Sequence, residues 1–279
     1  MNKEIRLVVS AGKEVDGDHA DTASGAAHNQ SVVKAVALIG CFVRNNDGLT
    51  LTELARSTGM NMSTAYRMLQ TLTLTGVLRR NHGEERYFVG PLLLTLAGST
   101  FSHSGYRTVQ DILTGLAEET EESVSFGIRD TNCVAVLLTA SSPQQLRFEH
   151  KTGDRLPIHC SSMGKALLAF DNSPLPETVA SLGYLQRRTS KTIVHTESLI
   201  RELGEVRGRG YAICDEELFN GVKSVAVVCA RDREPARAAI GVQGPAGRMT
   251  PERIERFVEA ANGAASLISQ LPILDRLPI

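Results

Sequence analysis

The stretch from Leu49 to Arg80 constrains the fold more than any other part of this chain, because its apolar residues recur at helical spacing on both sides of a glycine. Residues 50–58 carry one apolar stripe, and the run after Gly59 carries another. The second stripe consists of Ala65, Met68, Leu69 and Leu72, at i, i+3, i+4 and i+7. Gly59 can adopt the left-handed conformation that ends a helix. Two helices joined by so short a turn predict a helix-turn-helix.

The face opposite the second stripe is polar. Ser63, Arg67 and Gln70 recur there at i, i+4 and i+7, and Thr64 and Tyr66 flank them. All five side chains can hydrogen-bond to phosphates or base edges. A rigid helix that presents such groups predicts a double-stranded DNA operator as the partner. The alternative is a pair of packed helices with no such role, which helical spacing alone leaves open.

Two strand-like runs follow Gly76 and enclose a polar turn, which predicts a β-hairpin wing. The basic residues expected to contact DNA from this wing are Arg79, Arg80 and Arg86. An amphipathic helix over residues 31–44 completes a winged helix-turn-helix domain that we assign to residues 31–91. Residues 31–92 hold seven basic and four acidic side chains, a charge of +3 in a chain of net charge −1. So small a surplus predicts DNA affinity that depends on dimerisation and on salt.

The length of 279 residues and the hydrophobic content of 42% predict a chain with two domains. No apolar run reaches the roughly 18 residues of a membrane span, and residues 1–30 lack a secretory apolar segment, so we expect a cytoplasmic protein that does not enter a membrane. Residues 1–30 read as a mobile tail. The five cysteines are odd in number and lack metal-ligand spacing, which favours reduced core thiols over a metal site. No cofactor is expected.

The remainder alternates between helical and strand-like patterns. Residues 92–121 predict two connector helices, broken at Gly105. Strand patterns then lie at 123–128, 133–140, 145–150, 211–214, 224–230 and 238–244, and helical patterns lie at 162–170, 197–209 and 251–270. Strands joined by short turns and flanked by helices predict an α+β domain over residues 122–272, built on an antiparallel sheet.

Five segments carry a resemblance to a known family. They are TLTELARSTGMNMSTAYRMLQTL, YFVGPLLLTLA, RLPIHCSSMGKALLAF, RGRGYAICDEELFNGVKSVAV and AAIGVQGPAGR. In their order and spacing, the chain resembles the IclR family of bacterial transcription regulators from about residue 31 to residue 270. The resemblance implies a winged helix-turn-helix joined to a GAF-like effector-binding domain, acting as a homodimer or a dimer of dimers. It also implies control of a catabolic operon, as repressor or activator.

The resemblance further implies a small organic acid effector, bound between the sheet and the loop that enters the helix at Gly164. Amide groups at that helix start, from Ser162, Met163 and Gly164, would favour a carboxylate. The other implied contacts are an apolar wall of Phe148 and Leu156, the side chains of Cys214 and Ser224, and the strand residues Gly241 and Gln243. A thioether, a thiol and a missing hydroxyl among these favour a more apolar acid than the smallest keto acids, such as an aromatic carboxylate.

Several of these residues have plainer interpretations. Cys214 and Ser224 could be small core residues, because buried cysteine behaves as a hydrophobe. For His159 we expect a hydrogen bond to the backbone in preference to a ligand. Lys165 is expected to be a solvated charge, with a cap on the pocket or a link to acids such as Asp215 or Glu216 as the alternatives.

An enzyme is the reading least supported by the motifs. Ser162 to Lys165 is formally S-x-x-K, and residues 151–153 are formally K-T-G, but the K-T-G comes first, the reverse of the order in penicillin-binding enzymes. We therefore assign no catalytic residue. An enzyme without a recognisable motif, and a ligand-sensing protein without a DNA function, remain the alternatives to a DNA-binding regulator.

Overall fold

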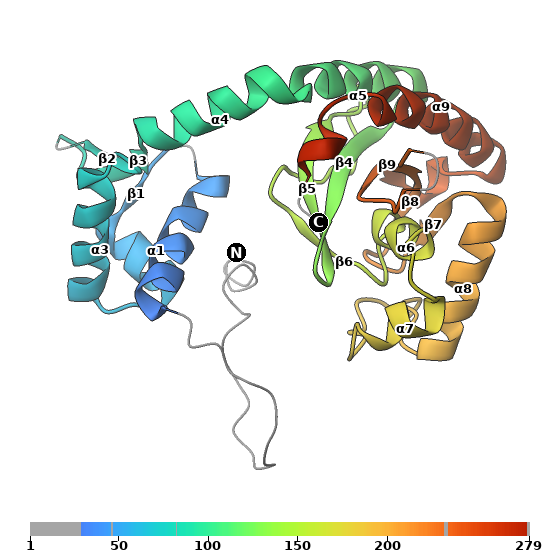
Figure 1. The fold of residues 1–279 in the computed structure, drawn as a ribbon, viewed down its shortest axis with the longest axis horizontal. Helices are drawn as coiled ribbons and strands as arrows, with labels where there is room; N and C mark the ends of the chain where they lie inside the picture. Colours follow the sequence, from blue (N-terminus) through green and yellow to red (C-terminus); the bar gives the residue numbers. More distant parts are fainter. Residues whose placement is uncertain (1–28, 46, 82, 232–233, 278–279) are drawn as a thin grey trace, which may run out of the picture. The chain divides into compact units, whose positions relative to one another are not determined.

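The computed structural model describes residues 29–45, 47–81, 83–231 and 234–277, and it divides into two compact units, Met1–Thr100 and Phe101–Ile279 (Figure 1). The predicted mobile tail falls almost wholly outside the described residues, since only Asn29 and Gln30 of it are described. The domain boundaries drawn from the sequence stay predictions.

The N-terminal unit has the winged helix-turn-helix topology. Its elements are α1 (Gln30–Gly40), the 3-10 helix η2 (Cys41–Arg44), β1 (Leu49–Thr50), α2 (Leu51–Thr58), α3 (Met62–Leu74), β2 (Leu78–Asn81) and β3 (Arg86–Val89). The strands form an antiparallel sheet in the order β1-β3-β2. Leu38, Leu54, Leu69 and Leu78 are fully buried between helices and sheet. Strand β1 was not predicted, because two residues are too few to show a period.

Local signals set the ends of α2 and α3. Thr50 caps α2 in a reciprocal capping box with Glu53, which satisfies two backbone amides at the helix start. Gly59 ends α2 with φ 68°, the left-handed conformation expected from the sequence. Asn61 then caps α3 by accepting a hydrogen bond from the amide of Thr64 at 2.8 Å. The turn between the helices is therefore fixed at both sides.

The helix α4 (Pro91–Ser104) is followed by α5 (Tyr106–Thr120). The C-terminal unit then contains a six-stranded antiparallel sheet in the order β6-β5-β4-β9-β8-β7. Its strands are β4 (Ser123–Asp130), β5 (Cys133–Ala140), β6 (Arg155–Pro157), β7 (Ala212–Asp215), β8 (Val222–Cys229) and β9 (Ala238–Pro245). Its other helices are α6 (Ser162–Ala169), α7 (Leu175–Ala180), α8 (Thr196–Arg209) and α9 (Pro251–Ser269), with the 3-10 helices η3 (Ala246–Arg248) and η4 (Leu274–Arg276).

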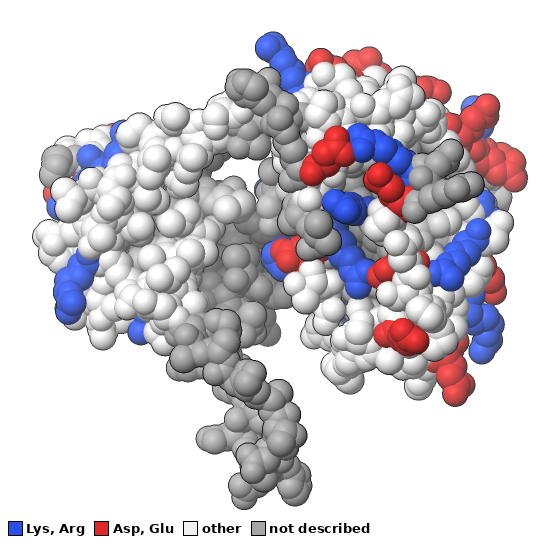
Figure 2. Space-filling model, viewed as in Figure 1, with Lys and Arg blue, Asp and Glu red and all other residues white. Residues whose placement is uncertain are grey.

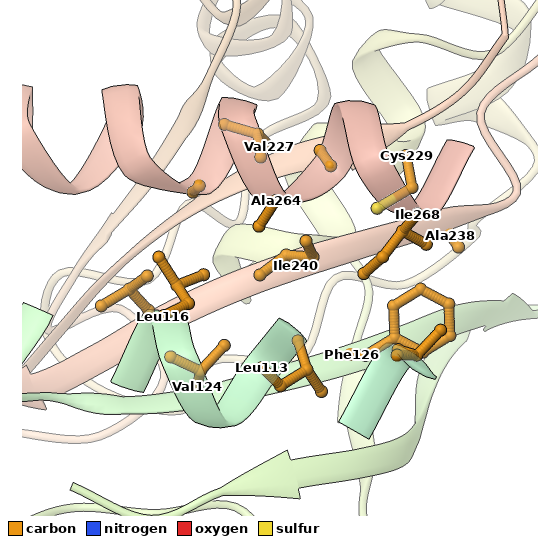
Figure 3. Packing of buried hydrophobic residues seen from close by; sticks show 14 of the residues in the cluster. Leu113, Leu116, Val124, Phe126, Val227, Cys229, Ala238, Ile240, Ala264 and Ile268 are labelled. Carbon is orange, nitrogen blue, oxygen red and sulfur yellow. The ribbon is translucent and has the colours of Figure 1, made fainter. Parts of the chain in front are cut away.

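Helices cover both faces of this sheet, α5 and α9 on one side and α6, α7 and α8 on the other (Figure 1). Alternate residues of one strand serve the two sides, as strand geometry requires: Val225 and Val227 pack toward α9, whereas Ala226 packs with the α6 group. In Figure 3, Leu113 of α5 and Ile268 of α9 lie against the same face of the sheet. Helix α5, predicted as a connector, thus forms part of this core.

The expected strand at residues 145–150 is wrong. The backbone there is irregular, and β6 takes the edge position beside β5, with Leu156 opposite Val134. Leu146, one of the alternating apolar residues of this segment, does not face a core, since it is 73% exposed. The alternation of apolar and polar residues at 145–150 therefore indicated a strand, but the edge of β5 is paired with β6 instead. Helix α7 was missed because its six residues are too short for a helical stripe.

Candidate nucleic-acid interface and effector site

The helix α3 presents the predicted polar residues on the side away from the core. Ala65 and Leu69 are fully buried, which fixes how the helix is rotated. Arg67 and Gln70 lie on the exposed side, and Tyr66 is 38% exposed. The side-chain amide of Gln70 donates from Nε2 to the Tyr66 hydroxyl at 2.7 Å. The helix is thus a rigid rod with one hydrogen-bonding face, as recognition of base edges requires.

Ser63, Thr64 and Arg67 have different surroundings on this face. Ser63 donates to the side chain of Asn61 at 3.0 Å, at the N-terminal end of α3. Arg67 and Thr64 line a groove between α3 and α1, to which Lys34 of α1 also contributes. Lys34 was not among the predicted contacts, because the stripe on α1 singled out only its apolar residues. The groove brings two cations together beside the exposed face of α3.

The three arginines of the wing have different environments. Arg79 is exposed, with its guanidinium carbon 4.4 Å from the centre of the Phe88 ring. Arg80 forms an ion pair with Glu85. Arg86 donates to the carbonyl of Gly48 at 2.8 Å. The predicted basic rim is therefore partly engaged within the unit itself, and Arg79 is the member most open to a phosphate.

Figure 2 shows the charges on one face of the molecule. Basic side chains of the N-terminal unit are scattered among uncharged ones there, whereas acidic and basic side chains are mixed over the C-terminal unit. This pattern fits the small basic surplus of residues 31–92. So small a surplus favours DNA binding through a few positioned side chains over binding through a broad electrostatic field.

In the C-terminal unit, the structure brings most of the predicted effector residues to the start of α6. Ser224 stands opposite Cys214 on β7 and opposite Gln243 on β9, so the three lie side by side across the sheet. The Ser224 hydroxyl donates to Ser162 Oγ at 2.8 Å and thereby joins the sheet to α6. Gln243 donates to the Ser125 hydroxyl at 2.8 Å.

Met163 and Gly241 meet at the same place. Met163 is 2% exposed, and a Cβ atom on Gly241 would lie 3.0 Å from its Cγ. Leu156 is buried in the hydrophobic cluster that also contains Met163. Phe148 instead packs its ring against His150 and Phe219, with centroid distances of 5.1 and 5.3 Å. Of the two residues expected to form the apolar wall, only Leu156 therefore belongs to the hydrophobic cluster of Met163.

The helix start differs in one respect from the expectation of three available amides. Ser161 is the N-cap of α6, and its hydroxyl accepts a hydrogen bond from the amide of Gly164 at 3.2 Å. That expectation is therefore wrong for Gly164, whose amide is already used. The amides of Ser162 and Met163 are left as the candidate donors to a carboxylate.

The buried thiols beside the helix start are protonated. Burial raises the pKa of Cys160 to about 12 and also raises the pKa of Cys214. The Cys214 thiol donates to the carbonyl of Cys160 at 3.1 Å, a role that only the protonated form can fill. His159 accepts or donates at Nε2 with the carbonyl of Gln186 at 3.0 Å, so the expected backbone partner for this histidine is confirmed.

Lys165 is not the solvated charge expected from the sequence. It is 1% exposed, and its ammonium lies 2.6 Å from Glu217 Oε1 and 3.0 Å from Glu202 Oε1. Burial raises the pKa of Glu217, against the effect of Lys165. Burial alone would lower the pKa of Lys165, but the two carboxylates outweigh it and raise that pKa. Lys165 does pair with acidic residues, which was one of the alternatives, but its partners are Glu202 and Glu217 and not Asp215 or Glu216.

A winged helix-turn-helix followed by a helix-covered antiparallel sheet defines the class as a DNA-binding protein with a second, α+β unit. Residues 31–82 match the model of the IclR helix-turn-helix domain, and residues 103–270 match that of the bacterial transcriptional regulator IclR C-terminal domain. The chain belongs to the IclR family of bacterial transcription regulators, which confirms the resemblance.

Curated relatives agree with this assignment. The chain is 31% identical over 225 residues to the HTH-type transcriptional regulator BhcR of Paracoccus denitrificans, covering 80% of this chain and 81% of that protein. It is 29% identical over 240 residues to the transcriptional repressor IclR of Escherichia coli, covering 85% and 87%. These relatives and the domain matches show that the chain is a DNA-binding transcription regulator. Its family consists of transcription regulators and not of enzymes.

Solved structures have the same α+β fold. An IclR transcriptional regulator from Alicyclobacillus acidocaldarius superposes with a TM-score of 0.74 at 26% identity, covering 87% of this chain and 98% of that one. An IclR homologue from Microbacterium hydrocarbonoxydans, complexed with 4-hydroxybenzoate, superposes with a TM-score of 0.71 at 22% identity, covering 88% and 100%. Within the described part of the chain, no helix is both long enough and apolar enough to span a membrane.

Proposed function

We propose that this regulator reads its operator with Ser63, Thr64, Tyr66, Arg67 and Gln70 of α3 and holds the DNA backbone with the wing. The observation that supports it best is the exposed polar face of a helix whose other face is fixed in the core by Ala65 and Leu69. Arg67 carries the sharpest expectation, because its planar guanidinium can bind a guanine edge through two hydrogen bonds. Arg79 supplies a phosphate contact from the wing.

Arg67→Ala tests this assignment. We expect a loss of about 1 to 3 kcal/mol in operator affinity, measured by fluorescence anisotropy with DNA from upstream of the regulated gene. Loss of discrimination at one operator position indicates base reading, whereas an equal loss for all sequences indicates a phosphate contact. Arg201→Ala, an exposed arginine on α8, is the control. Unchanged affinity in Arg67→Ala would contradict both roles.

The second part of the proposal is that a small organic acid binds at the start of α6. The amides of Ser162 and Met163 would donate to its carboxylate, helped by the positive end of the helix dipole. Ser224 contacts that point through Ser162, Cys214 and Gln243 lie opposite Ser224 on the neighbouring strands, Gly241 lies against Met163, and Leu156 belongs to the same hydrophobic cluster as Met163. A protein of this fold holds 4-hydroxybenzoate, so the fold can accommodate an aromatic acid. Effector binding would bias the position of the DNA-binding units through a difference in affinity between two states.

Thermal melting against glyoxylate, pyruvate, succinate, benzoate and 4-hydroxybenzoate tests the effector class. A ligand at 100 times its dissociation constant stabilises the folded protein by about 2.7 kcal/mol, which is readily seen as a shift in melting temperature. Ser224→Ala should reduce the shift, whereas Ser266→Ala, an exposed serine on α9, should not. A shift that Ser224→Ala leaves intact would place the acid elsewhere.

The third part is self-association, as a homodimer or a dimer of dimers. Two copies would carry two copies of α3 to successive major grooves, about 34 Å apart on an operator with two-fold symmetry. Exposed apolar side chains support a contact between copies: Val32 and Val36 on α1 are 58% and 60% exposed, and Leu94 on α4 is 64% exposed. Light scattering should give two or four times the chain mass of 30.1 kDa. A single-chain mass at micromolar concentration would contradict it.

A further inference from the structure

The side chain of Met163 fills the space above two glycines on neighbouring strands. A Cβ atom on Gly127 of β4 would lie 3.3 Å from Met163 Sδ, and one on Gly241 of β9 would lie 3.5 Å from the same sulfur. On Gly127 a Cβ atom would also lie 2.6 Å from the Val134 side chain, so packing within the sheet already requires glycine there. On Gly241 the nearest atoms belong to Met163. The thioether thus occupies the volume that a side chain at position 241 would take.

The polar groups around Met163 are satisfied by one another. Ser224 donates to Ser162, and Gln243 donates to Ser125, each at 2.8 Å. Ser162 and Gln243 are both buried, at 4% and 1% exposed. The thioether thus lies against the two glycines, and the polar side chains beside it are paired with one another. A ligand that lies on these glycines must displace the Met163 thioether.

Met163 is the part most suited to move. It is unbranched and has three rotatable bonds, and its sulfur makes favourable contacts with aromatic ring edges. The two glycines beneath it belong to β4 and β9, which are hydrogen-bonded neighbours. Withdrawal of the thioether would uncover Gly241 and the part of Gly127 that the Val134 side chain does not cover, and a planar ring could lie there. The serine and glutamine side chains would then face the edge of that ring.

We propose that Met163 is the gate of the effector site and selects a flat, benzoate-sized carboxylate whose ring replaces the thioether on Gly127 and Gly241. This inference rests on the proposed effector site at the start of α6. A closed gate lowers the observed affinity by the fraction of molecules in which it is open. Removal of the gate therefore raises affinity for a ligand that needs the space, and changes affinity little for one that does not.

The test compares Met163→Ala with the wild-type chain by calorimetry, with benzoate and pyruvate as probes. Met249→Ala is the matched control, since Met249 is equally buried, at 1% exposed, but packs in the cluster on the other face of the sheet. We expect Met163→Ala to bind benzoate about tenfold tighter or more, as for a gate open in a tenth of molecules or fewer. Pyruvate affinity should change much less. Equal benzoate affinity in Met163→Ala and wild type, or the same gain in Met249→Ala, would overturn the gate.

A second measurement uses the wild-type chain and does not depend on the variant's stability. Methionine methyl groups labelled with carbon-13 give one NMR signal each, and Met163→Leu identifies the signal of Met163. Benzoate should shift that signal and leave the signal of Met249 in place. A stationary Met163 signal up to millimolar benzoate would overturn the proposal.

Operator binding in the presence of each acid distinguishes a failure of the Met163 gate from a failure of acid control. If another acid in the panel releases the operator while benzoate behaves identically with both chains, the gate is wrong and acid control stands. If no acid changes operator binding, acid control itself fails.

Discussion

Gly164 approaches Ile158 so closely that a Cβ atom on the glycine would lie 2.1 Å from the Ile158 carbonyl oxygen. The first turn of α6 therefore rests directly on the backbone of the segment that enters it. In the same turn, Ser162 accepts a hydrogen bond from Ser224 of the sheet. Position 164 therefore requires glycine because of packing against Ile158.

Gly164→Ala should destabilise the protein by about 1 to 3 kcal/mol, because the added methyl forces backbone apart. Gly204→Ala is the matched control in a neighbouring helix, α8, where a Cβ atom would meet nothing within 4 Å. That change should stabilise by up to about 1 kcal/mol through helix propensity. Urea unfolding measures both. Equal stability of the two variants would contradict the close contact as the reason for the glycine.

Lys165→Met should destabilise the protein strongly, since it leaves the buried carboxylate of Glu217 without its cation. Loss of one partner of a buried pair typically costs about 3 to 5 kcal/mol. The double variant Lys165→Met with Glu217→Gln should recover part of this loss, because no buried charge is then left unpaired. Lys191→Met is the control, since Lys191 pairs with Glu216 at the surface and should matter much less. If urea unfolding gave Lys165 and Lys191 the same effect, the buried pair would be unimportant for folding.

His150 should make stability depend on pH. Burial lowers the pKa of His150 to about 4 from its usual 6.5, with Asp154 opposing the shift. Above pH 6.5 the ring is neutral in both states. As the pH falls from 6.5 toward 4, the unfolded chain binds a proton that the folded chain refuses, so the free energy of unfolding falls by up to about 3 kcal/mol.

His150→Leu should remove this component. We would measure the unfolding free energy of variant and wild type by urea at intervals from pH 7 to pH 4. Over this range the variant should gain up to about 3 kcal/mol of stability relative to the wild type. His195→Leu, at an exposed histidine, supplies the comparison. Parallel pH profiles for His150→Leu and wild type would show that the ring is not buried as neutral imidazole.

The sequence predicted the helices and central strands because their periods are local. Ala65 and Leu69 repeat at helical spacing whatever surrounds them, and both are buried as expected. What it could not predict depends on partners far along the chain. The place of the edge strand was decided by pairing with β5, and the burial of Lys165 was decided by Glu202 and Glu217, 37 and 52 residues away. The spacing of residues along the sequence gives no information about contacts of this kind.

The candidate effector site shows the same division. The segments that resemble the family pointed to Ser162, Ser224 and Gln243. The sheet register places Ser224 opposite Gln243, and a hydrogen bond joins Ser224 to Ser162. The segments did not reveal Gly127, whose contact with Met163 follows from the pairing of β4 with β9. Nor did they reveal that Phe148 packs with Phe219. The residues of a site can be matched along a chain, but the space between them exists only in the fold.

The wing arginines should separate DNA contact from stability. Arg79→Ala should weaken binding to all DNA sequences alike and reduce the salt slope of binding by about 1, as expected for one lost phosphate contact. Arg86→Ala should instead lower the stability of the N-terminal unit by about 1 kcal/mol, since Arg86 donates to the Gly48 carbonyl and lies 3.5 Å from Glu53. Anisotropy at several salt concentrations and thermal unfolding measure the two effects. If Arg86→Ala lowered the salt slope as much as Arg79→Ala with no loss of stability, Arg86 would leave its partners in the wing to bind the DNA backbone.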